Sequence, residues 1–123
     1  MKREAPEIRW RAVIGGGAAT LLITFLLSLA GTAGGSGLLL AVAAPVGIVV
    51  GAAAAGRLAR TAGILHGGLV GALWIVAEAI AGTGRPGTSN VLADTALTVV
   101  YDLAWLGLGA LAGYLGSRSA GGD

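Results

Sequence analysis

The sequence predicts an all-α integral membrane protein: a polytopic four-helix bundle that forms one domain over residues 1–123. The chain is 55% hydrophobic and only 11% charged, whereas roughly a quarter of the residues in a soluble domain are charged. Each of its four apolar segments is about 20 residues long, which is the length that a helix needs to span a membrane. A content of 23 glycines with a single phenylalanine favours close contact between helix backbones over a core of large side chains.

The first span is predicted at about residues 12–30, after a short basic arm in which Trp10 lies between two arginines and suits a membrane interface. The arm and the small residues after the span also fit a signal peptide, but the apolar run is longer than a usual signal core, so we expect a retained helix. Thr20, Thr24 and Ser28 recur every four residues. This spacing puts them on one helix face, which we expect to contact protein.

The second span is predicted at about residues 38–56, between an uncharged loop at 31–37 and a tight basic turn at 57–63. Pro45 lies near its middle and predicts a kink, because proline removes a helical hydrogen bond. The third span is predicted at about residues 64–82. The loop at 83–89 then holds turn formers and Arg85.

The fourth span is predicted at about residues 91–116 and carries two acids, Asp94 and Asp102. Asp94 falls in the first turn, where a carboxylate complements the helix dipole and Ser89 or Asn90 can cap the helix. Asp102 lies far inside the apolar segment. It therefore needs a protein environment rather than lipid.

Basic residues predict the orientation. Seven of the eight fall at one face of a four-span arrangement, against Arg85 at the other, which places both termini in the cytoplasm. Spans two and four end in similar Gly- and Ala-rich segments that finish with arginine. The same bundle can therefore also be described as two helical hairpins in parallel repetition. The seven are Lys2, Arg3, Arg9, Arg11, Arg57, Arg60 and Arg118.

Pairs of glycines four residues apart predict where helices pack against one another. These pairs fall in the cytoplasmic half of the spans, so this half is expected to be closely packed, within one chain or between copies. The outer half is expected to hold either a water-filled vestibule or a dry hydrogen-bonded cluster. The predicted packing residues are Gly47 and Gly51, Gly67 and Gly71, and Gly109 and Gly113.

The candidate polar site lies in that outer half, around Glu78 and Asp102. Acids beside aromatic rings suit a cation, through charge and cation–π attraction, or a proton relay. The alternative is that the acids pair with hydroxyls or indole N–H groups and only order the helices. The candidate residues are Glu78, Asp102, Thr24, Ser28, Trp74, Tyr101 and Trp105.

Several functional classes lack support in the sequence. The absence of cysteine excludes disulfides and thiolate chemistry, and His66 has no second ligand at metal spacing, so we expect it to serve packing. No catalytic set or phosphate-binding loop is present, and a net charge of +2 gives no basic run for nucleic acid. We therefore expect no enzyme activity, cofactor, metal or nucleic-acid partner.

Two segments carry a family resemblance: the Trp-Arg-Ala-Val-Ile-Gly opening at Trp10–Gly15 and the His-Gly-Gly-Leu-Val-Gly run at His66–Gly71. With the Gly-rich fourth span, they resemble small four-span prokaryotic membrane proteins that are frequent in haloarchaea. Those families have no assigned activity, so the resemblance implies a fold and no site. Small multidrug transporters carry a glutamate in their first span, whereas the first span of this chain has only hydroxyl groups. Fluoride channels carry a characteristic asparagine and a Thr/Phe-rich stretch, and that pattern is missing here.

The function expected from the sequence is association in a prokaryotic cell membrane, as a homo-oligomer or as an accessory subunit of a membrane complex. Short loops, the absence of a reactive set and the number of small-residue faces favour it. The alternative is a small channel or transporter for a cation or proton that uses Glu78 and Asp102.

Overall fold

The computed structural model describes residues 5–82 and 90–121, and within them all regular structure is helical. Four helices are present, and each is long and apolar enough to cross a membrane. This confirms the predicted all-α class and the number of helices. The helices are α1 (Trp10–Gly34), α2 (Gly37–Ala59), α3 (Gly63–Ala81) and α4 (Val91–Ser119).

The connection between α1 and α2 is shorter than predicted. The sequence predicts a loop at 31–37, but α1 continues to Gly34 and only two residues separate the helices. Gly35 ends α1 in the left-handed conformation, with a φ of 65°, which glycine adopts without steric cost. The Ser36 side chain then accepts a hydrogen bond from the Leu39 N–H and caps α2. The helix therefore ends where the αL glycine lies, and the earlier glycines do not break it.

The basic turn after α2 is also shorter than the predicted range 57–63. Arg57 belongs to the last turn of α2, which ends at Ala59. Arg60 and Ala62 then take positive φ angles of 62° and 50° and reverse the chain. Helix α2 passes through Pro45 as one continuous helix, so the proline does not divide the span.

The start of α4 follows the prediction. The Asn90 side chain accepts hydrogen bonds from the N–H groups of Leu92 and Ala93, which are among the donors left without helical partners at a helix start. Asp94 lies in the first turn, where its charge complements the helix dipole. The predicted loop at 83–89, with Arg85 and Ser89, lies outside the described residues.

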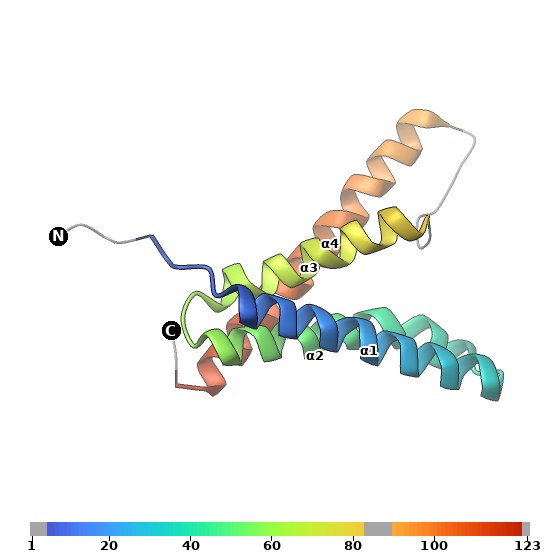
Figure 1. The fold of residues 1–123 in the computed structure, drawn as a ribbon. Coiled ribbons are helices and arrows are strands. Elements are labelled where there is room, and N and C mark those ends of the chain that lie inside the picture. Colours follow the sequence, from blue (N-terminus) through green and yellow to red (C-terminus); the bar gives the residue numbers. More distant parts are fainter. Residues whose placement is uncertain (1–4, 83–89, 122–123) are drawn as a thin grey trace.

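The four helices form two hairpins joined at one end (Figure 1). Helices α1 and α2 make one hairpin, and α3 and α4 make the other. The hairpins meet at the end where α1 begins and α4 ends, which also holds the α2–α3 turn, and they diverge toward the opposite end (Figure 1). Within the described residues α1 and α4 make no contact. The predicted bundle is thus closed at one end only, and the molecule has the shape of a V.

Glycines make the junction of the V possible. A Cβ atom on Gly67 would overlap the carbonyl oxygen of Gly109, and one on Gly56 would overlap the carbonyl oxygen of Gly113. The first pair joins α3 to α4, and the second joins α2 to α4. Because backbone lies against backbone at these crossings, no side-chain rotation can make room for a larger residue.

Within the first hairpin, threonines of α1 pack on glycines of α2. Gly51 lies against Thr20, and Gly47 lies against Thr24. The Thr20 hydroxyl donates to the carbonyl of Gly16 at 3.0 Å, and the Thr24 hydroxyl donates to the carbonyl of Ala43 at 3.4 Å. The hydroxyl face of α1 therefore contacts protein, and its partner is α2.

Candidate functional site

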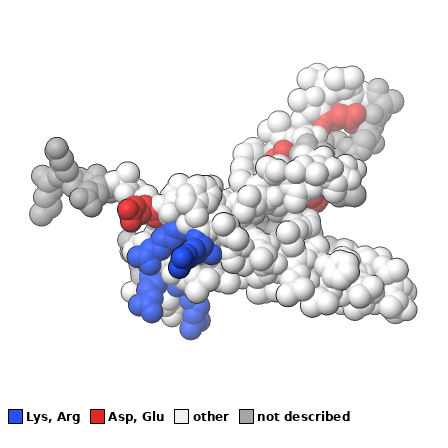
Figure 2. Space-filling model, in the orientation of Figure 1, with Lys and Arg blue, Asp and Glu red and all other residues white. Residues whose placement is uncertain are grey.

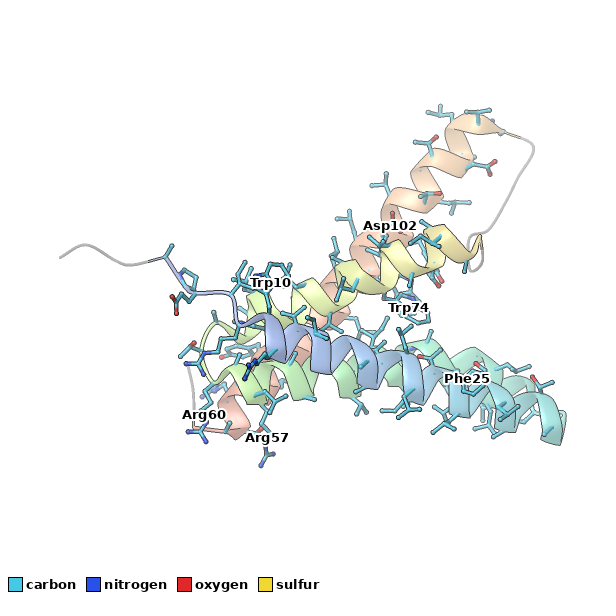
Figure 3. The ribbon with its side chains drawn as sticks, viewed as in Figure 1. Trp10, Phe25, Arg57, Arg60, Trp74 and Asp102 are labelled. Atoms are coloured by element: carbon cyan, nitrogen blue, oxygen red, sulfur yellow. The ribbon has the colours of Figure 1, made fainter. Side chains whose placement is uncertain are left out.

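The acidic site lies within the second hairpin, between α3 and α4. Glu78, near the end of α3, is only 6% exposed. The Tyr101 hydroxyl of α4 donates a hydrogen bond to its Oε1 atom at 3.3 Å. Asp102 follows Tyr101 on α4, is half-buried and has a buried Oδ1 atom (Figure 3). Two carboxylates thus lie along one apolar hairpin, where the bilayer disfavours charge.

Three aromatic rings line the same region. Trp74 and Trp105 meet edge to face with ring centroids 6.4 Å apart, and Tyr101 meets Trp105 in the same manner at 5.3 Å. Each such pair is worth about 0.5–1.5 kcal/mol beyond the area it buries. The indole Nε1 atoms of both tryptophans are buried and have no hydrogen-bond acceptor among the described residues. The cluster therefore offers two N–H donors.

The structure brings five of the seven candidate residues to one hairpin. Thr24 and Ser28 are the exceptions, because they lie on α1 in the other hairpin. Thr24 contacts α2 instead, and α1 does not reach α4. The residues gathered between α3 and α4 are Trp74, Glu78, Tyr101, Asp102 and Trp105.

A mainly apolar groove of 320 Å³ lies between α1 and α3, inside the V. Small residues line it, namely Gly17, Ala18 and Ala77, and longer side chains such as Leu21 and Leu73 border it. Trp74 lines the groove as well, so its ring connects the groove to the acidic site. The sequence carried no signal for this groove, because it depends on how two non-consecutive helices are placed.

His66 links the first helix to the α2–α3 turn. The side chain is completely buried, and its Nε2 atom accepts a hydrogen bond from the Arg9 backbone N–H at 2.9 Å. Its Nδ1 atom lies 2.9 Å from the Ala62 carbonyl. Because a backbone N–H can only donate, Nε2 is the acceptor, and the proton lies on Nδ1. His66 is thus a neutral structural residue, in line with the packing role expected from sequence.

Among the described residues the arginines lie at one end of the molecule together with Glu7, which precedes α1, whereas the remaining acids lie on α3 and α4. Arginine side chains gather where the hairpins join, and the acids of α3 and α4 lie along the diverging arm (Figure 2). The acidic arm carries Glu78, Asp94 and Asp102.

Chemically, the site between α3 and α4 combines two carboxylates, a phenol hydroxyl and two indole N–H groups. Among the described residues, no three His, Cys, Asp or Glu side chains lie close enough together to hold a metal ion. No protein-family model matches this chain, and no curated protein or solved structure is significantly similar to it. The functional conclusion therefore rests on the geometry of the chain itself.

Proposed function

We propose that this protein acts by association with other membrane helices, as a homo-oligomer or as an accessory subunit of a larger membrane complex. We place it as a multi-pass protein in the cell membrane of a prokaryote, with both termini cytoplasmic, because the arginines gather at the end where α1 begins and α4 ends. The same proposal includes membership of the haloarchaeal-type families that the Trp10–Gly15 and His66–Gly71 segments resemble.

The observation that carries the proposal is the gap between the hairpins. Beyond the junction, each helix packs mainly against its hairpin partner (Figure 1). A bilayer leaves no void between two diverging hairpins, so either lipid or another helix occupies the space. The groove there is lined by small residues of α1 and α3, and small residues let a second helix approach closely enough for strong van der Waals contact.

The glycine pairs of the sequence do not supply this surface. Gly47, Gly51, Gly67, Gly71, Gly109 and Gly113 all lie against backbone or side chains of the same chain. The small-residue stripes counted in favour of association are thus occupied within one molecule. Association is proposed instead through Gly17, Ala18 and Ala77.

Cysteine crosslinking tests the proposal directly, because the native chain has no cysteine. Ala18→Cys and Ala77→Cys place single thiols in the groove, and Leu111→Cys places one on an exposed face of α4. In native membranes we expect the two groove variants to crosslink to a second chain and the α4 variant not to. Native mass spectrometry of the protein in mild detergent then gives the number of copies and the mass of any partner.

A blocking variant provides the matched control. Ala18→Trp fills the groove and is expected to convert the assembly to monomers, whereas Leu111→Trp is expected to leave it intact. A monomeric wild-type protein with no co-purifying partner would contradict the proposal. Equal crosslinking from Leu111→Cys would also contradict it, since that result would reflect random collision.

The second candidate function is a channel or transporter for a cation or proton. The observation in its favour is the buried Glu78 beside Tyr101 and two tryptophan rings. A carboxylate together with aromatic faces is a combination that binds cations.

For this candidate we expect protein in liposomes to carry a cation or proton flux that the double variant Glu78→Gln/Asp102→Asn abolishes. Asp94→Asn is the matched control, because Asp94 lies on the same helix but in its first turn, and it should leave the flux unchanged. The absence of flux in the wild type, or an equal flux in the double variant, would exclude this function and leave association.

A further inference from the structure

Two cavities lie side by side at the basic end of the molecule. One, of 480 Å³, is lined by Arg9, Trp10, Arg11, Ala12 and Leu58. The other, of 490 Å³, also has Leu58 in its wall. Both open where the hairpins join, the end at which arginines gather (Figure 2). Leu58 thus lies in the walls of both cavities.

The second cavity draws its residues from two helix ends. Arg57 and Arg60 come from the last turn of α2 and the turn that follows it, and Ser119 and Ala120 come from the end of α4. Among the residues that the structure describes, no Asp or Glu lines either cavity. Two arginines thus border each cavity, and this positive charge favours an anionic group such as a phosphate.

Apolar surface adjoins this charge. Leu58 is 60% exposed and Trp10 is 57% exposed, although both lie at the ends of membrane-spanning helices. On α1, Gly15 faces Leu58, since a Cβ atom there would lie 3.8 Å from the leucine Cδ1 atom. Exposed apolar groups next to arginines at a span end match the boundary between phosphate and acyl chain in a phospholipid.

We propose that this end of the protein is a binding site for an anionic phospholipid that carries two phosphates, such as diphosphatidylglycerol. One phosphate lies between Arg9 and Arg11, the other lies between Arg57 and Arg60, and acyl chains lie against Leu58. The two-cavity arrangement favours this lipid over one with a single phosphate, because both arginine pairs are then neutralised by one molecule. The site is separate from the groove proposed for association.

Lipid titration of the purified full-length chain tests the site, with native mass spectrometry counting bound lipids. The probes are diphosphatidylglycerol, phosphatidylglycerol and phosphatidylcholine. We expect diphosphatidylglycerol to bind most tightly and phosphatidylcholine most weakly. A contribution of about fivefold in affinity is expected for each arginine at an anionic membrane surface. Equal retention of all three lipids would overturn the proposal.

Charge-matched variants separate a defined site from general attraction. Arg11→Gln and Arg57→Gln each remove one arginine, one from each cavity, and each is expected to weaken diphosphatidylglycerol binding about fivefold. Arg118→Gln removes the same charge at the same end, but Arg118 lines neither cavity. It donates instead to the Tyr114 hydroxyl at 3.1 Å and lies over the Tyr114 ring. Its substitution should leave binding nearly unchanged.

An equal loss in all three variants would mean that only net charge matters, and it would overturn the proposal. Competition between the lipid and inorganic diphosphate is the remaining test. If it displaces the lipid from the wild-type protein at equal concentration, the site recognises a soluble phosphate compound rather than a lipid, and the proposal is wrong. Unchanged thermal unfolding of the variants confirms that they are folded, which is expected because the substituted arginines are exposed.

Discussion

Replacing Gly113 with leucine is expected to prevent the two hairpins from joining, so that little folded protein is recovered. A Cβ atom at this position would overlap the carbonyl oxygen of Gly63 and approach the backbone of Gly67, and Gly113 itself lies against Gly56. Gly113 thus lies where α2, α3 and α4 meet, and no space is left there for a side chain. Even Gly113→Ala is expected to lower the free energy of unfolding by about 1–3 kcal/mol, the usual cost of overpacking.

The control for this prediction lies on the same helix. Gly107 has nothing within 4 Å of its would-be Cβ atom, so Gly107→Ala adds a methyl group to open space. It is expected to raise the helix stability of α4 slightly, since alanine is favoured over glycine in a helix interior by about 1 kcal/mol. Unfolding in dodecyl sulfate, followed by tryptophan fluorescence, measures both. If the two alanine variants unfold alike, the junction is not as closely packed as described.

Replacing His66 with alanine is expected to be the most damaging change at a polar side chain. The side chain is completely buried, and removal of a large buried side chain typically costs about 2–5 kcal/mol. The substitution also leaves the Arg9 N–H and the Ala62 carbonyl without their side-chain partner. The loss should appear in dodecyl sulfate unfolding and in faster proteolysis before α1, because Arg9 is the residue that His66 holds.

Two amide variants test the hydrogen bonds of the two ring nitrogens of His66 separately. His66→Gln offers an acceptor near the position of Nε2, and His66→Asn offers a donor near the position of Nδ1. Each is expected to recover part of the stability that His66→Ala loses. If neither recovers any, packing volume and not hydrogen bonding accounts for the role of His66.

The elements of this fold could be predicted because their signals are local. Hydropathy and length predict four helices, and residue type limits the cap of α4 to Ser89 or Asn90, of which Asn90 is the one observed. The positions at which α1 and α2 end were not predicted, because the identity of a glycine or an arginine does not determine whether its backbone takes the left-handed conformation. That choice at Gly35 and Arg60 sets where the helices end.

The site could be predicted only in part, and for a physical reason. Trp74 and Glu78 on α3, and Tyr101 and Trp105 on α4, share helix faces, and consecutive helices with short connections pack side by side. Their meeting thus follows from sequence. The companions expected on α1 were wrong because depth in the membrane does not fix lateral position. Thr24 was expected at the depth of the acids, but its hydroxyl donates to Ala43 of α2.

The V shape also has a consequence for the lipid around the protein. Near the junction the four helices occupy a narrow cross-section, and at the open end the two hairpins stand apart (Figure 1). In a bilayer the molecule therefore takes up unequal area in the two leaflets. Where no further helix fills the space between the hairpins, lipids of the leaflet at the basic end would surround one compact group of four helices, whereas those of the other leaflet would pack around two separate hairpins. The close glycine contacts at one end thus give the protein a smaller cross-sectional area in one leaflet than in the other.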